Sequence, residues 1–274
     1  MNIGLIIVGD EILSGKREDK HLPKVIELLA ARGLVLTWAR YVGDEPARIT
    51  ADLKDAFASG DAVFSCGGIG ATPDDHTRQC AAAALGRPTE LHPEARDLIL
   101  QRMRDMAAEK GLPYEPDRGD NAQRLNMGVF PRGAEIIPNP FNKIAGFSVA
   151  SPVVGAEAGA GVYFVPGFPV MAWPMIEWVL DGRLAHLHHA NPQVERSVIV
   201  FGTMEGTLTP LMQAIEAEFA GVKVFSLPSV DHPTWGAHIE LGVKGPTASV
   251  DVAYPRLLAG LAGHGARLGP EMVR

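Results

Sequence analysis

The sequence contains little cysteine and no surplus of positive charge. Two cysteines occur among 274 residues, too few for a disulfide framework, and this scarcity favours a reducing compartment. Lys and Arg total 25 against 32 acidic residues, and the formal net charge of −7 argues against a large nucleic-acid-binding surface. No apolar run approaches the roughly 20 residues that cross a bilayer. We therefore expect neither a nucleic acid nor a membrane as a partner.

The first residues carry no secretory signal. A strand pattern, Ile3 to Val8, begins almost at once, without the basic flank and cleavage site of a secretory peptide. Together with the scarcity of cysteine, this start predicts a cytoplasmic protein. The hydrophobic share of 46% is enough to bury a substantial core.

The first two thirds of the chain alternate between strand and helix patterns. Apolar runs predict strands at 3–8, 35–42, 62–65, 135–137, 147–149 and 162–165. Helical periods, several of them ending at glycine, predict helices at 21–32, 47–58, 77–85, 93–110 and 171–180, with a surface loop at 113–121. This order predicts an α/β fold of three layers, α/β/α, around a mostly parallel sheet.

The pattern changes after a linker at 186–192. Strands are expected at 196–201, 222–227 and 237–243, and helices at 209–219 and 250–261. This β-α-β-β-α order predicts a small α+β second domain. We therefore expect two domains, residues 1–185 and 192–274.

The strongest candidate site is the turn from Cys66 to Thr77, which follows a predicted strand and opens a predicted helix. Its three glycines permit positive φ angles, so that successive N–H groups can point at an anion (Gly67, Gly68 and Gly70). The helix adds its N-terminal dipole at the same place. Asp74 and Asp75 either cap this helix or bridge a divalent cation to a bound phosphate, as carboxylates do for Mg²⁺. The turn predicts a site for a small phosphorylated ligand.

Two further loops follow strands of the same sheet. The first carries acids and a hydroxyl between two glycines (Gly9, Asp10, Glu11, Ser14 and Gly15), and the second carries Asp44. Ordinary loop polarity accounts for the first loop taken alone, and helix capping accounts for Asp44 taken alone. Because ligands bind beyond the carboxyl ends of parallel strands, we expect all three loops to meet at one rim.

Two residues near these segments are candidates for a chemical role. Cys66 precedes the glycines, but no histidine is placed beside it by a catalytic pattern, so a small buried apolar group is expected. Lys143 could supply positive charge to a phosphate, although a solvated surface lysine is the interpretation that we prefer.

Several motifs in order resemble those of one family. The run from Gly67 to Thr77 resembles the GGxGxTxDDxT signature of the molybdopterin-binding fold, which MoaB/Mog proteins, gephyrin and the N-terminal part of CinA share. The segment from Gly9 to Gly15 resembles the GDELLSG turn that opens CinA-like proteins. Asn139-Pro140 and Pro166-Gly167-Phe168-Pro169 fall where the family has its NPxGxAPGF and PGxPxEM segments. The resemblance covers about residues 1–180, and the tail is similar, more weakly, to the small middle domain of CinA. Lys20 and His21 stand where family members have a Thr-Asn pair.

The resemblance implies a function and a set of site residues. A domain of this kind binds molybdopterin or a related nucleotide at the glycine turn, and Asp44 and Asp75 match the aspartates that serve nucleotidyl chemistry and hold a divalent cation, expected to be Mg²⁺. The ligand contacts that the matched motifs imply are Gly9, Asp10, Glu11, Ser14, Gly15, Gly67, Gly68, Gly70, Thr72, Asp74, Thr77, Asn139, Pro166 and Gly167.

Two alternative functions stay open. CinA relatives imply a metal-dependent pyrophosphatase that acts on ADP-ribose-like nucleotides. A non-catalytic assembly protein that kept the fold is the other alternative. The resemblance also implies a homo-oligomer, and no amidohydrolase activity is expected, because the sequence shows no counterpart of the C-terminal domain of full-length CinA.

Overall fold

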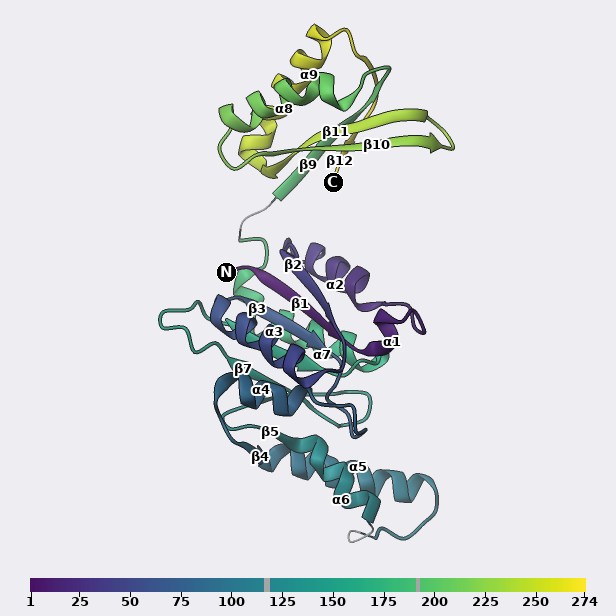
Figure 1. The fold of residues 1–274 in the computed structure, drawn as a ribbon, viewed down its shortest axis with the longest axis vertical. Coiled ribbons are helices and arrows are strands. Elements are labelled where there is room, and N and C mark those ends of the chain that lie inside the picture. The colour runs from purple at the N-terminus through teal and green to yellow at the C-terminus, as the bar shows by residue number, and fades with distance from the viewer. Residues whose placement is uncertain (116–118, 191–192) are drawn as a thin grey trace. The chain divides into compact units, whose positions relative to one another are not determined.

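The computed structural model describes residues 1–115, 119–190 and 193–274. The chain divides into two compact units, Met1–His188 and His189–Arg274, and each is described by itself (Figure 1). Over the described ranges, no helix combines the length and the apolar character that a membrane span requires.

The first unit is built on a six-stranded sheet in the order β2-β1-β3-β8-β7-β6. Its strands are β1 (Ile3–Val8), β2 (Trp38–Val42), β3 (Ala62–Cys66), β6 (Glu135–Ile137), β7 (Gly146–Ala150) and β8 (Gly161–Val165). The first four in the order pair in parallel, whereas β7 is antiparallel to both of its neighbours. Every residue of β1, β3 and β8 is buried, as their uninterrupted apolar runs require.

Helices cover both faces of this sheet. One face packs against α3 (Pro46–Ser59) and α4 (Thr77–Leu85), and the other against α2 (His21–Ala30) and α7 (Pro169–Gly182) (Figure 1). The first of the two cores contains a ladder of aromatic rings, in which Phe147 stacks on Phe130 at 4.5 Å and on Phe164 at 4.3 Å between ring centroids. The predicted three-layer α/β/α fold is confirmed.

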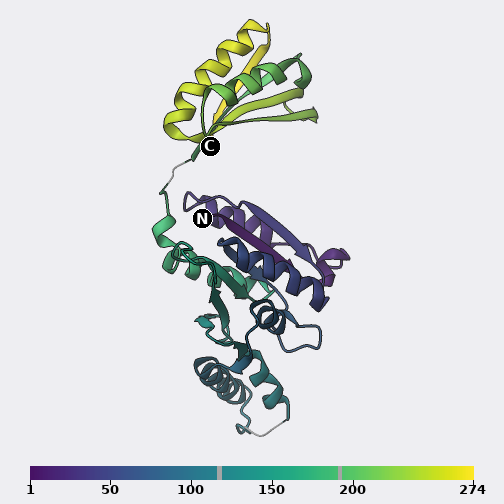
Figure 2. The ribbon, with the colours of Figure 1, turned by 60° about the vertical axis from the view of Figure 1, so that its left-hand side comes forward.

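A small lobe extends this unit beyond α4. It consists of β4 (Thr89–Leu91) paired with β5 (Val129–Pro131), α5 (Pro93–Glu109), α6 (Gly119–Leu125) and the short helix η1 (Asn126–Gly128) (Figure 2). The predicted surface loop at 113–121 is wrong at its end, where α6 begins, and its residues 116–118 lie outside the described chain. Strand β4 was not predicted, because its three residues are all exposed and show no alternation of apolar and polar side chains.

The second unit is a four-stranded antiparallel sheet in the order β10-β11-β9-β12. Helices α8 (Glu205–Glu218) and α9 (Thr247–Gly263) pack on one face of it (Figure 2). The strands are β9 (Gln193–Phe201), β10 (Lys223–His232), β11 (Gly236–Pro246) and β12 (Arg267–Val273). The predicted α+β class is confirmed. Strand β12 was not predicted, because Gly269 and Pro270 interrupt a mostly exposed segment.

Candidate functional site

The glycine turn leaves β3 along a path that side chains would block. Gly67 has a φ of +108°, and a Cβ there would lie 2.3 Å from the carbonyl oxygen of Val8. Gly68 has a φ of +69°, and its Cβ would lie 2.1 Å from Oγ1 of Thr77. Both positions therefore require glycine for backbone conformation and for space.

Four successive amides of this turn are free to bind a ligand. The amide of Gly67 donates to the carbonyl of Val165 at 3.0 Å, and that of Thr77 donates to the carbonyl of Gly68 at 3.0 Å. In the described chain, the amides of residues 68–71 have no hydrogen-bond partner. These residues line a cavity of about 370 Å³. Ile69 is buried and Gly68 and Gly70 are half-buried; since buried N–H groups normally find a partner, this run is a candidate site for an anion.

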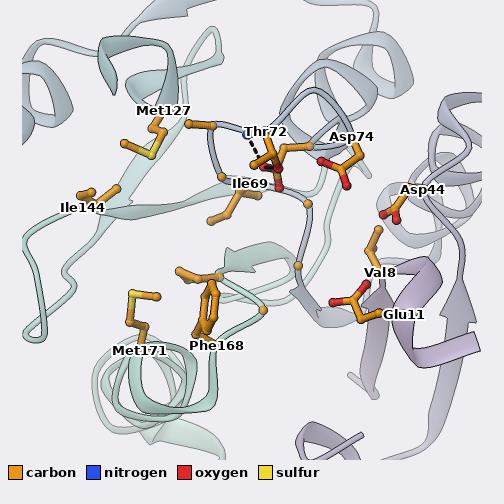
Figure 3. A pocket seen from close by; sticks show the side chains of 18 of the residues that line it. Val8, Glu11, Asp44, Ile69, Thr72, Asp74, Met127, Ile144, Phe168 and Met171 are labelled. Atoms are coloured by element: carbon orange, nitrogen blue, oxygen red, sulfur yellow. Dashed lines mark hydrogen bonds between the residues drawn. The ribbon is translucent and has the colours of Figure 1, made fainter. Parts of the chain in front are cut away.

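The two aspartates of the turn have different surroundings. Asp75 accepts a hydrogen bond from the amide of Thr72 at 2.8 Å and contacts the Thr72 hydroxyl, so its carboxylate closes the turn internally. Asp74 is exposed and lies on the same side of the cavity as Asp44 (Figure 3). The Thr72 hydroxyl and the backbone amide of Asp74 itself hold the pKa of Asp74 below its ordinary value.

The loops after β1 and β2 hold each other through a reciprocal pair of hydrogen bonds. The amide of Asp10 donates to Oδ2 of Asp44 at 2.9 Å, and the amide of Asp44 donates to Oδ1 of Asp10 at 3.1 Å. Partial burial raises the pKa of Asp44, and the negative charges of Asp10, Glu11 and Asp74 raise it further. The two loops therefore meet at one rim of the sheet. Their carboxylates concentrate negative charge there, which a bound cation would stabilise.

The cavity has an acidic side and an apolar side. Figure 3 shows Glu11, Asp44 and Asp74 together, and across from them a set of apolar side chains, Met127, Ile144, Phe168 and Met171. Phe168 is 55% exposed, so its ring offers an open surface. Met127, Ile144 and Met171 were not predicted as site residues, because isolated apolar residues in loops and helices carry no pattern that distinguishes a cavity wall from a core.

The structure places the predicted site residues in two groups. Those that line the cavity are Gly9, Glu11, Asp44, Gly67, Gly68, Gly70, Thr72, Asp74, Asp75, Pro166 and Gly167. Those that do not are Asp10, Ser14, Gly15, Thr77 and Asn139. Thr77 is fully buried beneath Gly68, and Ser14 and Gly15 are exposed at the end of the short helix α1 (Asp10–Leu13).

Asn139 does not line the cavity but holds the loop that forms part of its wall. Its side-chain amide donates to Oδ1 of Asn142 and to the carbonyl of Ile144, both at 2.9 Å, and its Oδ1 accepts from the amide of Phe141 at 3.0 Å. These bonds fold the loop that presents Asn142 and Ile144 to the cavity. In the same loop, Lys143 is exposed, as expected for a surface lysine; it pairs with Asp105 of α5 at 2.6 Å and does not line the cavity.

Arg78, which was not predicted as a site residue, is buried and holds the glycine turn in place by hydrogen bonds. Arg78 is 3% exposed, and its Nη2 donates to the carbonyl of Gly70 at 2.8 Å while its Nη1 donates to the carbonyl of Asn126. Its Nε is buried and has no partner in the described residues. Burial lowers the pKa of Arg78. The guanidinium thus joins the turn to the lobe, and it places a positive charge directly behind the free amides.

A second cavity, of about 410 Å³, adjoins the first. The two share Val8, Glu11, Arg17 and Gly167. Lys20, His21 and Cys66 also line the second cavity. Cys66 is 1% exposed and burial raises its pKa, which confirms that it is a buried apolar group.

The described residues contain no group of three or more His, Cys, Asp or Glu side chains arranged to hold a metal ion.

The fold and this site define an α/β protein with a glycine turn of unpaired amides at the carboxyl edge of a largely parallel sheet. The family model described as "Probable molybdopterin binding domain" matches residues 4–186. The chain belongs to this molybdopterin-binding family, in its CinA-like branch.

Several proteins similar to this chain are described as CinA-like proteins. A CinA-like protein of Syntrophotalea carbinolica is 29% identical over 229 residues, which are 80% of this chain and 51% of the relative. One from Anaeromyxobacter sp. strain K is 34% identical over 182 residues, 66% of this chain and 40% of the relative. The chain thus spans about half of the length of the relatives that it matches.

A solved structure supports the fold of the first unit. The protein CinA of Thermoplasma acidophilum, described as having unknown function, aligns with a TM-score of 0.52 at 25% identity. The alignment covers 66% of this chain and 96% of that one.

Proposed function

We propose that the first cavity binds the phosphate of molybdopterin, or of a related nucleotide, on the amides of residues 68–71. The observation that carries this proposal is the run of four amides without partners in the described chain, at the wall of a cavity of about 370 Å³. Such a run binds anions through oriented N–H dipoles. The buried charge of Arg78 behind the turn supports an anion further.

The apolar side of the cavity receives the ring system of the ligand. Phe168 offers a partly exposed aromatic face, and Met127, Ile144 and Met171 line the same side of the cavity. Aromatic and thioether side chains pack well against flat heterocycles. The pterin of molybdopterin and the purine of a nucleotide both meet this requirement, and each of these ligands carries its phosphate on a group outside the flat ring system.

The acidic side suits a divalent cation, expected to be Mg²⁺. Carboxylate oxygens are the ligands that Mg²⁺ prefers, and it is usually held by one or two carboxylates together with substrate phosphates. Asp44 and Asp74 supply such a pair next to the free amides. Asp75, whose carboxylate already accepts from Thr72, has the role of shaping the turn. A cation bound at the acidic side would neutralise part of the negative charge of the phosphate.

A second candidate function is a metal-dependent pyrophosphatase that acts on ADP-ribose-like nucleotides. The observation that favours it is the position of Asp44 and Asp74 beside the amides, since a cation held there would contact a phosphate bound on them. A bound metal ion can polarise a phosphoryl oxygen and lower the pKa of water. In this function, the free amides hold the phosphate and Phe168 holds the base.

Calorimetric titration with AMP and with molybdopterin, each with and without Mg²⁺, tests the proposal. We expect binding that Mg²⁺ strengthens, and we expect Asp74→Asn to remove most of the Mg²⁺ effect while it leaves binding without metal in place. Leu112→Ala, an exposed position outside the cavity, is the control. Failure of both molecules to bind would refute the proposal and leave the non-catalytic assembly protein as the alternative. Release of AMP from ADP-ribose in the presence of Mg²⁺ would favour the pyrophosphatase.

A further inference from the structure

The side chain of Asn142 has a fixed orientation at the apolar side of the first cavity. Its Oδ1 accepts hydrogen bonds from Nδ2 of Asn139 at 2.9 Å and from the amide of Ile144 at 3.0 Å. Because an amide oxygen accepts and an amide nitrogen donates, these two bonds determine which end of the Asn142 group is oxygen. Its Nδ2 therefore points away from its own loop, toward Met171 in the first turn of α7, whose Sδ lies 3.2 Å away.

The Nδ2 group of Asn142 can donate more hydrogen bonds than the protein accepts from it. It carries two N–H bonds, and the thioether sulfur of Met171 is a weak acceptor for one of them. In the described part of the chain, Nδ2 has no further acceptor. Asn142 is half-buried and lines the cavity together with Ile144 and Met171. A ligand in the cavity can therefore accept a hydrogen bond from Nδ2.

The position of Asn142 indicates which part of the ligand it meets. Its neighbours Ile144 and Met171 belong to the apolar side of the cavity, across from the acidic side (Figure 3). In the proposed function, the phosphate is bound on the amides of residues 68–71 and its cation at the acidic side. The part of the ring system that reaches Asn142 is then the edge farthest from the phosphate-bearing group.

We propose that Asn142 selects the ring of the ligand by donating a hydrogen bond from Nδ2 to an acceptor on that far edge. The ligand class is a flat heterocycle with a ring nitrogen or a carbonyl oxygen there, as in purine and pterin rings. A ring with only C–H groups at this edge would leave the donor without a good acceptor, which weakens binding. In the NPxGxAPGF segment a glycine takes the place of Asn142, so this contact is a feature of the present chain and not of the motif. The inference rests on the proposed function, since the phosphate site must hold the ligand.

Calorimetry with two nucleotides that differ only at the ring edge tests this inference. The probes are purine riboside 5′-monophosphate, which is AMP without its amino group, and its benzimidazole counterpart, which has C–H groups in place of N1 and N3. The wild type should bind the purine probe about three- to tenfold more tightly, which is the effect of one hydrogen bond. Asn142→Asp keeps an oxygen for the bonds from Asn139 and Ile144 but replaces the donor by an acceptor. In this variant the preference for the purine probe should fall below about twofold or reverse.

The ratio of the two affinities is the quantity that tests the donor. The added negative charge of Asn142→Asp weakens both phosphorylated probes alike, so it cancels in the ratio. Asn2→Asp is the matched control, because it makes the same exchange at an exposed position that lines neither cavity. It should keep the preference of the wild type.

The outcomes separate the inference from the proposed function. Equal affinity of the wild type for both probes would overturn the selecting role of Asn142 and leave the phosphate site in place. A preference that persists in Asn142→Asp would also overturn it, because another group would then recognise the ring edge. If Asn142→Asp does not fold, NMR of the side-chain amide of Asn142 in the wild type decides. Its signals should shift more with the purine probe than with the benzimidazole probe, and equal shifts would overturn the inference. Binding of neither probe would refute the nucleotide form of the proposed function itself.

Discussion

Removal of the buried guanidinium of Arg78 should destabilise the first unit strongly. Arg78→Met keeps the length of the side chain but leaves the carbonyls of Gly70 and Asn126 without their donors. A hydrogen bond from a charged donor contributes about 1.5–3 kcal/mol, so two contribute about 3–6 kcal/mol. Relief from burying a charge offsets part of this loss. We expect a net loss of about 2–4 kcal/mol in the free energy of unfolding.

Urea unfolding followed by tryptophan fluorescence measures this loss. Three of the four tryptophans lie in the first unit, at positions 38, 173 and 178, so the signal reports mainly on that unit. Arg78→Lys keeps the charge but loses the forked geometry, and about half of the loss is expected. Arg96→Met removes an exposed guanidinium whose partner in the described part of the chain is Asp97, and it should change stability by less than about 0.5 kcal/mol. If Arg78→Met lowered the free energy of unfolding as little as Arg96→Met does, the role of Arg78 in holding the glycine turn would be refuted.

Three further predictions concern the rim and the core. Because the pKa of Asp44 is raised in the folded state, the folded protein binds more protons than the unfolded chain at this group; the stability of the wild type relative to Asp44→Asn should therefore fall as the pH rises from about 4 through that raised pKa, and urea titrations of both proteins across pH measure this difference. Phe147→Ala opens the aromatic ladder and should cost about 3–5 kcal/mol in the same assay, whereas a loss below about 1 kcal/mol would contradict tight packing there. Gly68→Ala should abolish AMP binding and lower thermal stability, because its methyl group would meet Thr77; unchanged AMP affinity would contradict the glycine requirement.

The parts of the fold that depend on local pattern were predictable from the sequence. The apolar runs of β1 and β3 are buried on both faces, and the glycine turn follows β3 at the edge where the loops after β1 and β2 also end. Parallel strands bring such loops together whatever their side chains are. The order of the elements was therefore enough to predict that Glu11, Asp44 and the glycines share one rim.

Contacts between distant segments were not predictable. Asp74 and Asp75 have the same capping pattern in sequence, and only the path of the backbone decides that Asp75 accepts from Thr72. Arg78 is an arginine in the first turn of a helix, which is normally exposed, and its burial depends on the lobe that carries Asn126. The hydrogen bond between Nε2 of His21 and the carbonyl oxygen of Gly167 joins two residues that are 146 positions apart along the chain.

Backbone amide NMR of the uniformly ¹⁵N-labelled protein, titrated with AMP in Mg²⁺, tests the anion site most directly. We predict that the amide signals of Gly68, Ile69, Gly70 and Ala71 move furthest, because these N–H groups gain a phosphate partner. The amides of Gly67 and Thr77, which already donate to carbonyl oxygens, should move less. Saturation with AMP that leaves the four signals in place, or that shifts a different segment instead, would contradict the account.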